Sequence, residues 1–224
     1  MLIWILLLFI TGYLIGCLHG SLAAQALSGV NIKKEGVKNS GASNAAIVLG
    51  WKYGLLVAFI DIFKGFAVVA GLRLLLETGN FTAEMTWTML FVAGAGVVFG
   101  HNFPFYMNFN GGKGTASVIG VMLALDWKLG LLGLFLLIGV SLATNYLVIG
   151  VLVLYGVYFV IAFVPASGAW PLLTASALFA MAVWKHSENI IRIKYGTEKK
   201  CLQFCVRNLP SQTNPDLMLV FLSF

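Results

Sequence analysis

The sequence predicts an all-α membrane protein, folded as a single bundle of about seven transmembrane helices, with its N-terminus outside and its C-terminus in the cytoplasm. Hydrophobic residues make up 60% of the 224 residues and charged residues only 10%, against about 25% charged residues in a typical soluble domain. Apolar runs recur along the chain, and about 20 such residues cross a bilayer. Basic residues gather in the polar segments between these runs, which indicates the cytoplasmic side.

The first expected helix covers residues 2–22, and its glycines recur at four-residue spacing, which favours close helix packing. These glycines are Gly12, Gly16 and Gly20. A polar segment, residues 29–44, follows and is too basic to be translocated easily. The second expected helix begins near residue 45 and runs to about residue 76.

Two opposite charges lie within the second expected helix. Asp61 and Lys64 are spaced i, i+3, so they share a helix face and can neutralise each other. Ionisable groups are expensive inside a membrane and are often functional. Either a structural tie between helices or a functional pair explains them.

The other expected spans follow residue 86. An acidic connection, residues 77–86, precedes a third helix, and Pro104 stops the chain from continuing that helix. The expected spans are residues 87–100, 115–125, 129–143, 147–164 and 171–184. The fourth, residues 115–125, is short, so it is either a tilted crossing or a re-entrant segment.

Seven crossings place three polar segments on one side: residues 29–44, 101–113 and 185–200. We expect one membrane domain over residues 1–198 and a disordered or membrane-apposed tail over residues 199–224, since the last apolar run is too short to span.

Several classes of function are excluded by composition and motifs. The net charge of +6 comes from basic residues at the ends of apolar runs, where lipid headgroups explain them better than nucleic acid does. Three cysteines give neither a disulfide framework nor a metal-binding spacing, so no metal or cofactor is expected. The chain also lacks an HxxxxD pair, a nucleophile elbow and a Walker loop.

The polar stretch GHNFPFYMNFNGGKGTA, residues 100–116, contains the strongest candidate for a binding site. Gly111, Gly112 and Gly114 surround Lys113, so backbone N–H groups can converge on an anion beside an ammonium group. This combination favours phosphate. Taken alone, the run is more often a flexible turn whose lysine marks the cytoplasmic side.

The other two polar segments also suit a phosphorylated ligand. Ser40, Gly41 and Asn44 lie before or at the start of a helix, whose N-terminal N–H groups favour anions, although Asn44 can instead cap that helix. On a continuing helix, His186 and Asn189 share one face.

Five motifs occur in an order and spacing that resemble those of a known family. They are GYLIG, NIKKEGVKNSGASN, DIFKG, GHNFP with NFNGGKGTA, and KHSENIIRIKYGTE. Over about residues 5–198 the chain resembles the PlsY acyl-phosphate:glycerol-3-phosphate acyltransferases of bacteria. The resemblance implies a seven-helix enzyme of the bacterial plasma membrane, with a site facing the cytoplasm. It implies transfer of a fatty acyl group from acyl phosphate to the 1-hydroxyl of glycerol 3-phosphate, in the lipid bilayer, giving lysophosphatidic acid and phosphate. It also implies a functional link to an enzyme that produces acyl phosphate.

The resemblance assigns roles to individual residues. It implies that Lys113, His186 and Asn189 are catalytic, with His186 as an orienting hydrogen-bond donor rather than a base. It implies substrate binding by a larger set: Lys38, Ser40, Gly41, Asn44, His101, Gly111, Gly112 and Gly114. A protein on the same scaffold that only binds or transports phosphorylated small molecules is the alternative. No paired repeat of the kind found in transporters is visible.

Three positions depart from the family pattern. Val37 and Val148 replace hydroxyl-bearing residues, and Ile47 replaces an arginine. Each missing charge-assisted contact to phosphate is worth about 1.5–3 kcal/mol. Two interpretations follow: an enzyme with lowered or altered activity, or a compensating base supplied by Lys33, Lys34 or Lys38.

Overall fold

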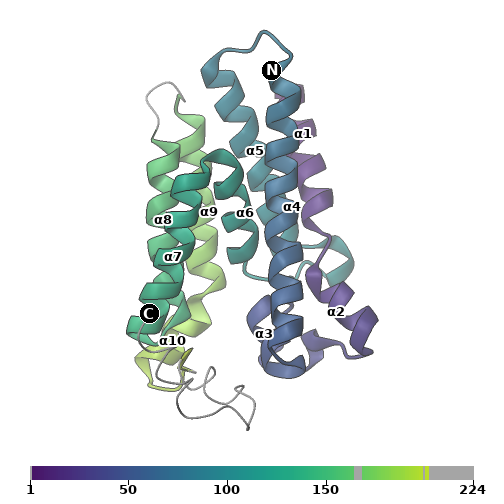
Figure 1. Cartoon of the computed structure of the whole chain (residues 1–224), viewed down its shortest axis with the longest axis vertical. Coiled ribbons are helices and arrows are strands. Elements are labelled where there is room, and N and C mark those ends of the chain that lie inside the picture. The colour runs from purple at the N-terminus through teal and green to yellow at the C-terminus, as the bar shows by residue number, and fades with distance from the viewer. Residues whose placement is uncertain (1, 164–167, 199, 202–224) are drawn as a thin grey trace, which may run out of the picture.

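The computed structural model describes residues 2–163, 168–198 and 200–201, and every regular element in these ranges is a helix (Figure 1). The α-helices are α1 Leu2–Gly16, α2 Gly20–Ser28, α3 Ala42–Leu49, α4 Trp51–Glu77, α5 Ala83–Asn102, α6 Thr115–Leu125, α7 Trp127–Thr144, α8 Leu147–Ala162, α9 Trp170–Lys185 and α10 Ser187–Lys194. Two 3-10 turns are η1 Ile32–Lys34 and η2 Phe105–Met107. The all-helical prediction is therefore confirmed for these residues. The tail expected over residues 199–224 lies almost wholly outside them.

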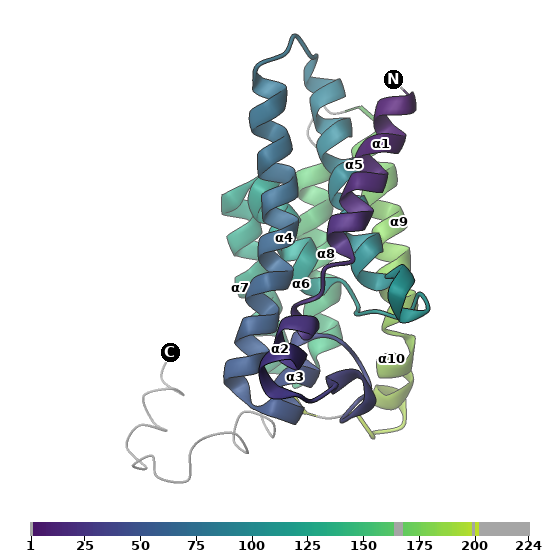
Figure 2. The ribbon, with the colours of Figure 1, turned by 90° about the vertical axis from the view of Figure 1, so that its right-hand side faces the viewer.

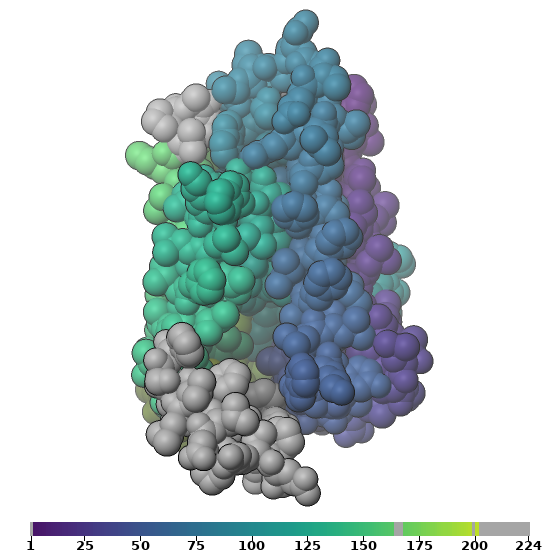
Figure 3. All heavy atoms as spheres, in the orientation of Figure 1, coloured from purple at the N-terminus to yellow at the C-terminus, as the bar shows by residue number. Residues whose placement is uncertain are grey.

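Within the described chain, four helical stretches are long and apolar enough to cross a membrane. They are Leu2–Ser28, Trp51–Glu77, Ala83–Met107 and Trp127–Thr144, while α6 and α8 are apolar but shorter. Large apolar side chains such as Phe59, Phe63 and Phe135 lie exposed on the outer surface of the bundle. Such a surface fits lipid and would be unfavourable in water. Figure 3 shows the elongated body that these helices form.

The interior is built on α5, whose residues from Thr88 to Val98 are all buried. Helix α1 packs against α5 and α4 packs against α6, and small residues allow these close approaches. A Cβ atom on Gly12 would overlap the carbonyl oxygen of Ala93, and one on Gly16 would overlap that of Val97. The packing role expected for these glycines is confirmed.

The first expected helix is interrupted, which corrects the prediction of one span over residues 2–22. Helix α1 ends at Gly16 and α2 begins at Gly20, with His19 in an extended conformation between them. Backbone groups at the break bond to side chains of α4. Lys64 Nζ donates to the carbonyl oxygens of Gly16 and Leu18 at 2.9 and 2.8 Å. An interrupted helix is tolerated in a membrane when such partners satisfy its backbone.

The second expected helix, from near residue 45 to about 76, is also two helices: α3 begins at Ala42, and Gly50, at φ 92°, separates it from α4. Other helix ends differ by a few residues from those expected. Helix α5 begins four residues early because Thr82 caps it by accepting a hydrogen bond from the Met85 N–H at 3.3 Å. Helix α6 has the expected bounds. Helix α8 ends at Ala162, and the predicted end at residue 164 lies outside the described residues.

The polar segments gather at one end of the bundle. Figure 2 shows α2, α3 and α10 at the end opposite the N-terminus and the connection between α4 and α5. Hydrogen bonds from Lys33 to Met107 and from Lys113 to Asn189 tie the α5–α6 connection to the other two polar segments. The tertiary structure thus brings together the three segments that the sequence predicted to share a side.

Candidate active site

The glycine-rich connection between α5 and α6 folds back onto the end of α5. The N–H of Gly111 donates to the carbonyl oxygen of Asn102 and that of Gly112 to His101, both at 3.0 Å. A Cβ atom on Gly112 would overlap the ring of His101. Gly114 adopts φ 80°, a left-handed conformation that favours glycine, and α6 starts after it with no side-chain cap. The glycines therefore serve the fold of this loop, and the N-terminus of α6 has no side-chain cap.

Lys113 lies at the centre of a hydrogen-bonded chain that reaches α10. Its ammonium donates to Asn189 Oδ1, and Asn189 Nδ2 donates to Glu198 Oε1 at 2.7 Å. Arg192 Nε donates to the other oxygen of Glu198 at 2.6 Å. Burial lowers the pKa of Lys113 to about 8, and the charge of Arg192 acts in the same direction. Two predicted catalytic residues, Lys113 and Asn189, are thus in direct contact.

His186 caps the C-terminus of α9 and is 3% exposed. Burial lowers its pKa to about 3, and the charges of Lys113 and then Lys185 add to the shift. The imidazole is therefore neutral at physiological pH. Neither ring nitrogen has a hydrogen-bond partner among the described residues. A buried, neutral ring with free nitrogens suits the orienting role predicted for it.

Asn102, the last residue of α5, is a polar residue that the sequence reasoning missed. It is fully buried, and neither side-chain amide atom has a partner in the described part of the chain. Its side chain lies against Gly114, where an added Cβ would be 2.7 Å from Oδ1. The GHNFP motif, which contains Asn102, could have indicated a functional role for this residue. From that motif, however, only the neighbouring His101 was predicted to bind substrate.

The first polar segment is organised by Asn44, which is fully buried. Asn44 Oδ1 accepts from the Val37 N–H at 2.9 Å. Its Nδ2 donates to the carbonyl oxygens of Ile32, Glu35 and Asn39, at 2.7, 3.1 and 2.7 Å. The amide thus shapes the loop, and Gly41, not Asn44, is the N-cap residue of α3.

Lys38 and Ser40 are not joined to the Lys113 site by any hydrogen bond or ion pair within the described ranges. Lys38 is exposed and adopts φ 53°. Ser40 is fully buried, and its hydroxyl has no partner among the residues described. The loop base that reaches the second polar segment is Lys33, whose Nζ donates to the Met107 carbonyl oxygen at 3.2 Å.

Comparison with known proteins decides the family. Residues 6–196 match the sequence model described as glycerol-3-phosphate acyltransferase. The chain belongs to the glycerol-3-phosphate acyltransferase family. It is 43% identical over 182 residues to glycerol-3-phosphate acyltransferase 1 of Oceanobacillus iheyensis, covering 81% of this chain and 87% of that protein. The Aquifex aeolicus glycerol-3-phosphate acyltransferase is 31% identical over 195 residues, covering 87% and 98%.

Two crystal structures of PlsY, an integral membrane glycerol 3-phosphate acyltransferase, share this fold. The glycerol 3-phosphate form is 30% identical and the lysophosphatidic acid form 31%, each with a TM-score of 0.75. Each match covers 88% of this chain and 94% of the PlsY chain. The predicted resemblance is therefore confirmed, and this chain is an integral membrane protein of the PlsY type.

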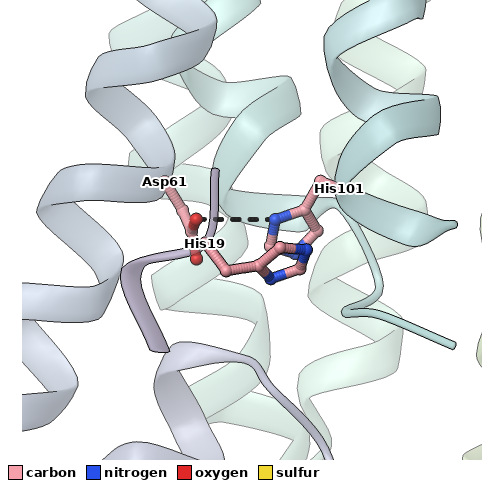
Figure 4. A group of neighbouring side chains, drawn as sticks. All are labelled: His19, Asp61 and His101. Carbon is pink, nitrogen blue, oxygen red and sulfur yellow. Dashed lines mark ion pairs between the residues drawn. The ribbon is translucent and has the colours of Figure 1, made fainter. Parts of the chain in front are cut away.

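In this acyltransferase, His101 lies in a buried polar cluster at the break between α1 and α2 (Figure 4). Its Nδ1 is 2.9 Å from Lys64 Nζ and 3.5 Å from Asp61 Oδ1, and its ring stacks on His19 with centroids 4.4 Å apart. The predicted Asp61–Lys64 pair is present at 2.9 Å. Since Lys64 also bonds to the end of α1, the pair connects α4 to α1. His101, on α5, belongs to the same hydrogen-bonded cluster.

The same cluster contains three residues of metal-ligating types, since the ligand atoms of His19, Asp61 and His101 all lie within 4.8 Å of one another. The ammonium of Lys64 already bonds to Asp61 and to His101. A divalent cation beside that ammonium would meet strong repulsion at this depth, where the effective dielectric is low. These donors fit an ion-pair network better than a metal site.

The three residues that depart from the acyltransferase pattern differ in how far they are exposed. Val37 is 42% exposed, Ile47 is half-buried on α3, and Val148 is buried in the first turn of α8. None of these side chains can donate a hydrogen bond to phosphate. A phosphate in this protein must therefore be held by other groups.

Proposed function

We propose that this chain transfers a fatty acyl group from acyl phosphate to the 1-hydroxyl of glycerol 3-phosphate, giving lysophosphatidic acid for phospholipid synthesis. The observation that carries the proposal is the contact between Lys113 and Asn189 beside the neutral, unpartnered imidazole of His186. The two PlsY structures, one in a glycerol 3-phosphate form and one in a lysophosphatidic acid form, support the same acceptor and product.

The reaction needs positioned donors rather than a strong base. The acceptor hydroxyl attacks the acyl carbonyl carbon, a C–O ester bond forms, and the bond to the phosphate oxygen breaks. The leaving phosphate takes the electron pair of that bond, and a substrate phosphate takes the hydroxyl proton. No covalent intermediate with the enzyme is required, because acyl phosphate already carries a good leaving group.

Each site residue has a part in this reaction. The Lys113 ammonium and the uncapped N-terminus of α6 would stabilise the departing phosphate. Neutral His186 would orient the acceptor through a hydrogen bond. The Asn189 amide would hold Lys113 in place through the bond that it accepts. Asn102, with both amide atoms free among the described residues, would add a donor beside Gly114.

We also propose the predicted topology: seven crossings by α1, α4, α5, α6, α7, α8 and α9, with the N-terminus outside and the C-terminus in the cytoplasm of a bacterial cell. The gathering of the basic polar segments at one end of the bundle supports it. This topology places the site on the cytoplasmic face, where glycerol 3-phosphate is available. A reporter fused after residue 198 would be active in the cytoplasm; periplasmic activity would contradict the proposal.

Acyl phosphates hydrolyse readily, so an enzyme that uses one needs a supply close by. We therefore propose a functional link to an enzyme that produces acyl phosphate. The membrane domain would cover residues 1–198, which agrees with the family match over residues 6–196.

The test is an assay of membranes containing the protein with labelled glycerol 3-phosphate and either palmitoyl phosphate or palmitoyl-CoA. We expect lysophosphatidic acid from the acyl phosphate and none above background from the thioester. Membranes without the protein and membranes with Lys113→Ala serve as controls. Absence of product at a high concentration of palmitoyl phosphate would refute the proposed catalysis. Product from palmitoyl-CoA but not from palmitoyl phosphate would refute acyl phosphate as the acyl donor.

A further inference from the structure

A cavity of about 520 Å³ lies at the end of the bundle opposite the polar segments. Its lining comes from the C-terminal part of α4, the first turns of α5, the junction between α6 and α7, and α8. The volume falls within the range of about 300–1,000 Å³ that is usual for ligand sites. The cavity shares no lining residue with the candidate active site, so it is a separate feature of the protein.

The shortness of α6 explains why this end of the bundle is hollowed. Helix α6 has 11 residues, whereas α4, which packs against it, has 27. Since an α-helix rises by about 1.5 Å per residue, α6 is about 16 Å long and α4 about 40 Å. Figure 1 shows α4 and α5 extending beyond the turn between α6 and α7. Their ends therefore form one wall of a space that α6 and α7 do not fill.

Arg73, on α4, lines this cavity and is held on two sides. Its Nη2 donates to the carbonyl oxygen of Leu125, the last residue of α6, at 2.8 Å, and its guanidinium carbon lies 6.0 Å from the centroid of the Trp87 ring. Every ion pair within the described ranges involves Asp61 or an acidic residue of the α10 region, so none neutralises Arg73 there. A guanidinium has several N–H donors, and its planar fork suits a phosphate.

Two carboxylates line the same cavity. Glu77 follows Arg73 by four residues and so lies on the same face of α4. Asp126 lies at the junction of α6 and α7, where its Oδ1 accepts from the N–H groups of Lys128 and Leu129 at 2.9 and 3.0 Å. With one positive and two negative side chains, the lining attracts a simple anion at one group and repels it at two. A ligand that carries both a negative and a positive group matches this lining.

Apolar side chains surround the charged groups. Leu76, Leu90 and Leu129 line the cavity too. On the outer surface, Leu75 and Leu132, close to them in the chain, are 71% and 47% exposed. Tryptophan, as at Trp87 in this cavity, is enriched at the level of the lipid headgroups. The cavity thus combines charges for a headgroup with an adjoining surface for acyl chains, which favours a lipid over a water-soluble ligand.

We propose that this cavity binds the headgroup of a zwitterionic phospholipid with a primary ammonium group, phosphatidylethanolamine. Its phosphate bonds to Arg73, and its ammonium group, two carbons away, bonds to Glu77 and Asp126. Its acyl chains lie along the neighbouring leucines. In the proposed topology the site faces the outer leaflet, on the opposite side from the candidate active site. The inference does not depend on acyl transfer.

The lining distinguishes three headgroups by their chemistry. Phosphatidylglycerol has a phosphate for Arg73 but no cation, so both carboxylates repel it. Phosphatidylcholine has a cation, but its trimethylammonium group has no N–H to donate to a carboxylate. Only phosphatidylethanolamine offers an acceptor to the guanidinium and N–H donors to the carboxylates. The expected order of affinity is therefore phosphatidylethanolamine, then phosphatidylcholine, then phosphatidylglycerol.

The test measures dissociation constants by native mass spectrometry of the full-length protein in detergent. The probes are the dioctanoyl forms of the three phospholipids. Arg73→Gln removes the positive charge, Arg73→Lys keeps it, and Glu77→Gln removes one carboxylate. Lys128→Gln is the matched control, because it removes a positive charge from the same end of the bundle at a residue that does not line the cavity.

We expect the wild type to bind phosphatidylethanolamine about tenfold or more tightly than phosphatidylglycerol, and Arg73→Gln to lose about tenfold, the factor that one charge-assisted hydrogen bond provides. Arg73→Lys should stay within about threefold of the wild type, since it keeps the charge. Glu77 is exposed, so Glu77→Gln should weaken phosphatidylethanolamine by only about two- to fivefold, while phosphatidylglycerol binds more tightly. Lys128→Gln should stay within about twofold for both lipids.

Three results would overturn the phosphatidylethanolamine site. They are equal affinities of the wild type for phosphatidylethanolamine and phosphatidylglycerol, unchanged binding of phosphatidylethanolamine in Arg73→Gln, and an equal loss in Lys128→Gln. If Arg73→Gln fails to fold, because it alters the bond to the end of α6, Glu77→Gln is the deciding variant. Opposite effects of Glu77→Gln on the two lipids would support the site, and an equal effect or no effect on both would refute it.

Discussion

Replacing Lys64 with methionine removes the centre of the buried tie between α1, α4 and α5. The ammonium bonds to Asp61 Oδ1 and His101 Nδ1 at 2.9 Å each and to two backbone carbonyl oxygens at the break after Gly16. Lys64 is 6% exposed and Asp61 1%, so water does not screen their attraction. The methionine would leave the buried carboxylate beside the Gly20 N–H, at 3.2 Å, and the more distant His101 Nδ1, at 3.5 Å, without the full charge of the ammonium.

The magnitude follows from these contacts. Breaking a buried ion pair by removing one partner costs about 3–5 kcal/mol of unfolding free energy, mostly because the other charge stays buried. For a protein of this size, about 2–4 °C of melting temperature corresponds to each kcal/mol, so we expect a loss of about 6–20 °C. The isosteric pair Asp61→Asn with Lys64→Met removes both charges, and it should be more stable than Lys64→Met alone.

The assay is thermal unfolding in detergent, followed by the fluorescence of the six tryptophans and by the fraction that stays monodisperse after heating. The four proteins needed are the wild type, the two single variants and the double variant. A melting temperature for Lys64→Met within about 2 °C of the wild type would refute the reasoning. So would a double variant whose loss equals the sum of the two single losses, because independent sites add and coupled charges do not.

Four further outcomes are expected. Lys113→Ala should abolish acyl transfer while the protein remains extractable and folded; retained turnover would show that the glycine loop is only structural. Since burial holds the pKa of Lys113 near 8, its ammonium is present below that pH and is lost above it, so affinity for the phosphorylated substrate should fall as pH rises through about 8. Lys113→Arg should shift this loss of affinity to higher pH. If the loss stays at the same pH, the titration of Lys113 is not its cause. Ile47→Arg should lower the KM for a phosphorylated substrate, whereas an unchanged KM would argue that Lys33 already supplies the whole contact. Asn44→Ala removes the bond that Oδ1 accepts and the two N–H donors that Nδ2 shares among three carbonyl oxygens, and it should lower the unfolding free energy by roughly 3 kcal/mol, at about 1 kcal/mol for each bond; a melting temperature equal to that of the wild type would contradict its role in shaping the loop.

The sequence by itself determined the class of fold and the approximate positions of the long apolar helices. A membrane helix satisfies its own backbone, so a run of apolar residues is enough to predict it. Local chemistry marks its ends, as Asp126 does between α6 and α7 by accepting hydrogen bonds from the N–H groups of Lys128 and Leu129. The ordered motifs determined the family, and with it the roles expected for Lys113, His186 and Asn189.

Only the tertiary structure decided which polar groups meet. The break between α1 and α2 depends on Lys64, 48 residues beyond Gly16 in the chain, and the contact between Lys113 and Asn189 joins residues 76 apart. The structure places His101 beside Asp61, and it places the amide of Asn102, its neighbour in the motif, beside Gly114 with no hydrogen-bond partner among the described residues. Residue type fixes what a side chain can bond to. Packing between distant helices decides which partner is within reach, and a hydrogen bond or ion pair forms only over a few ångströms.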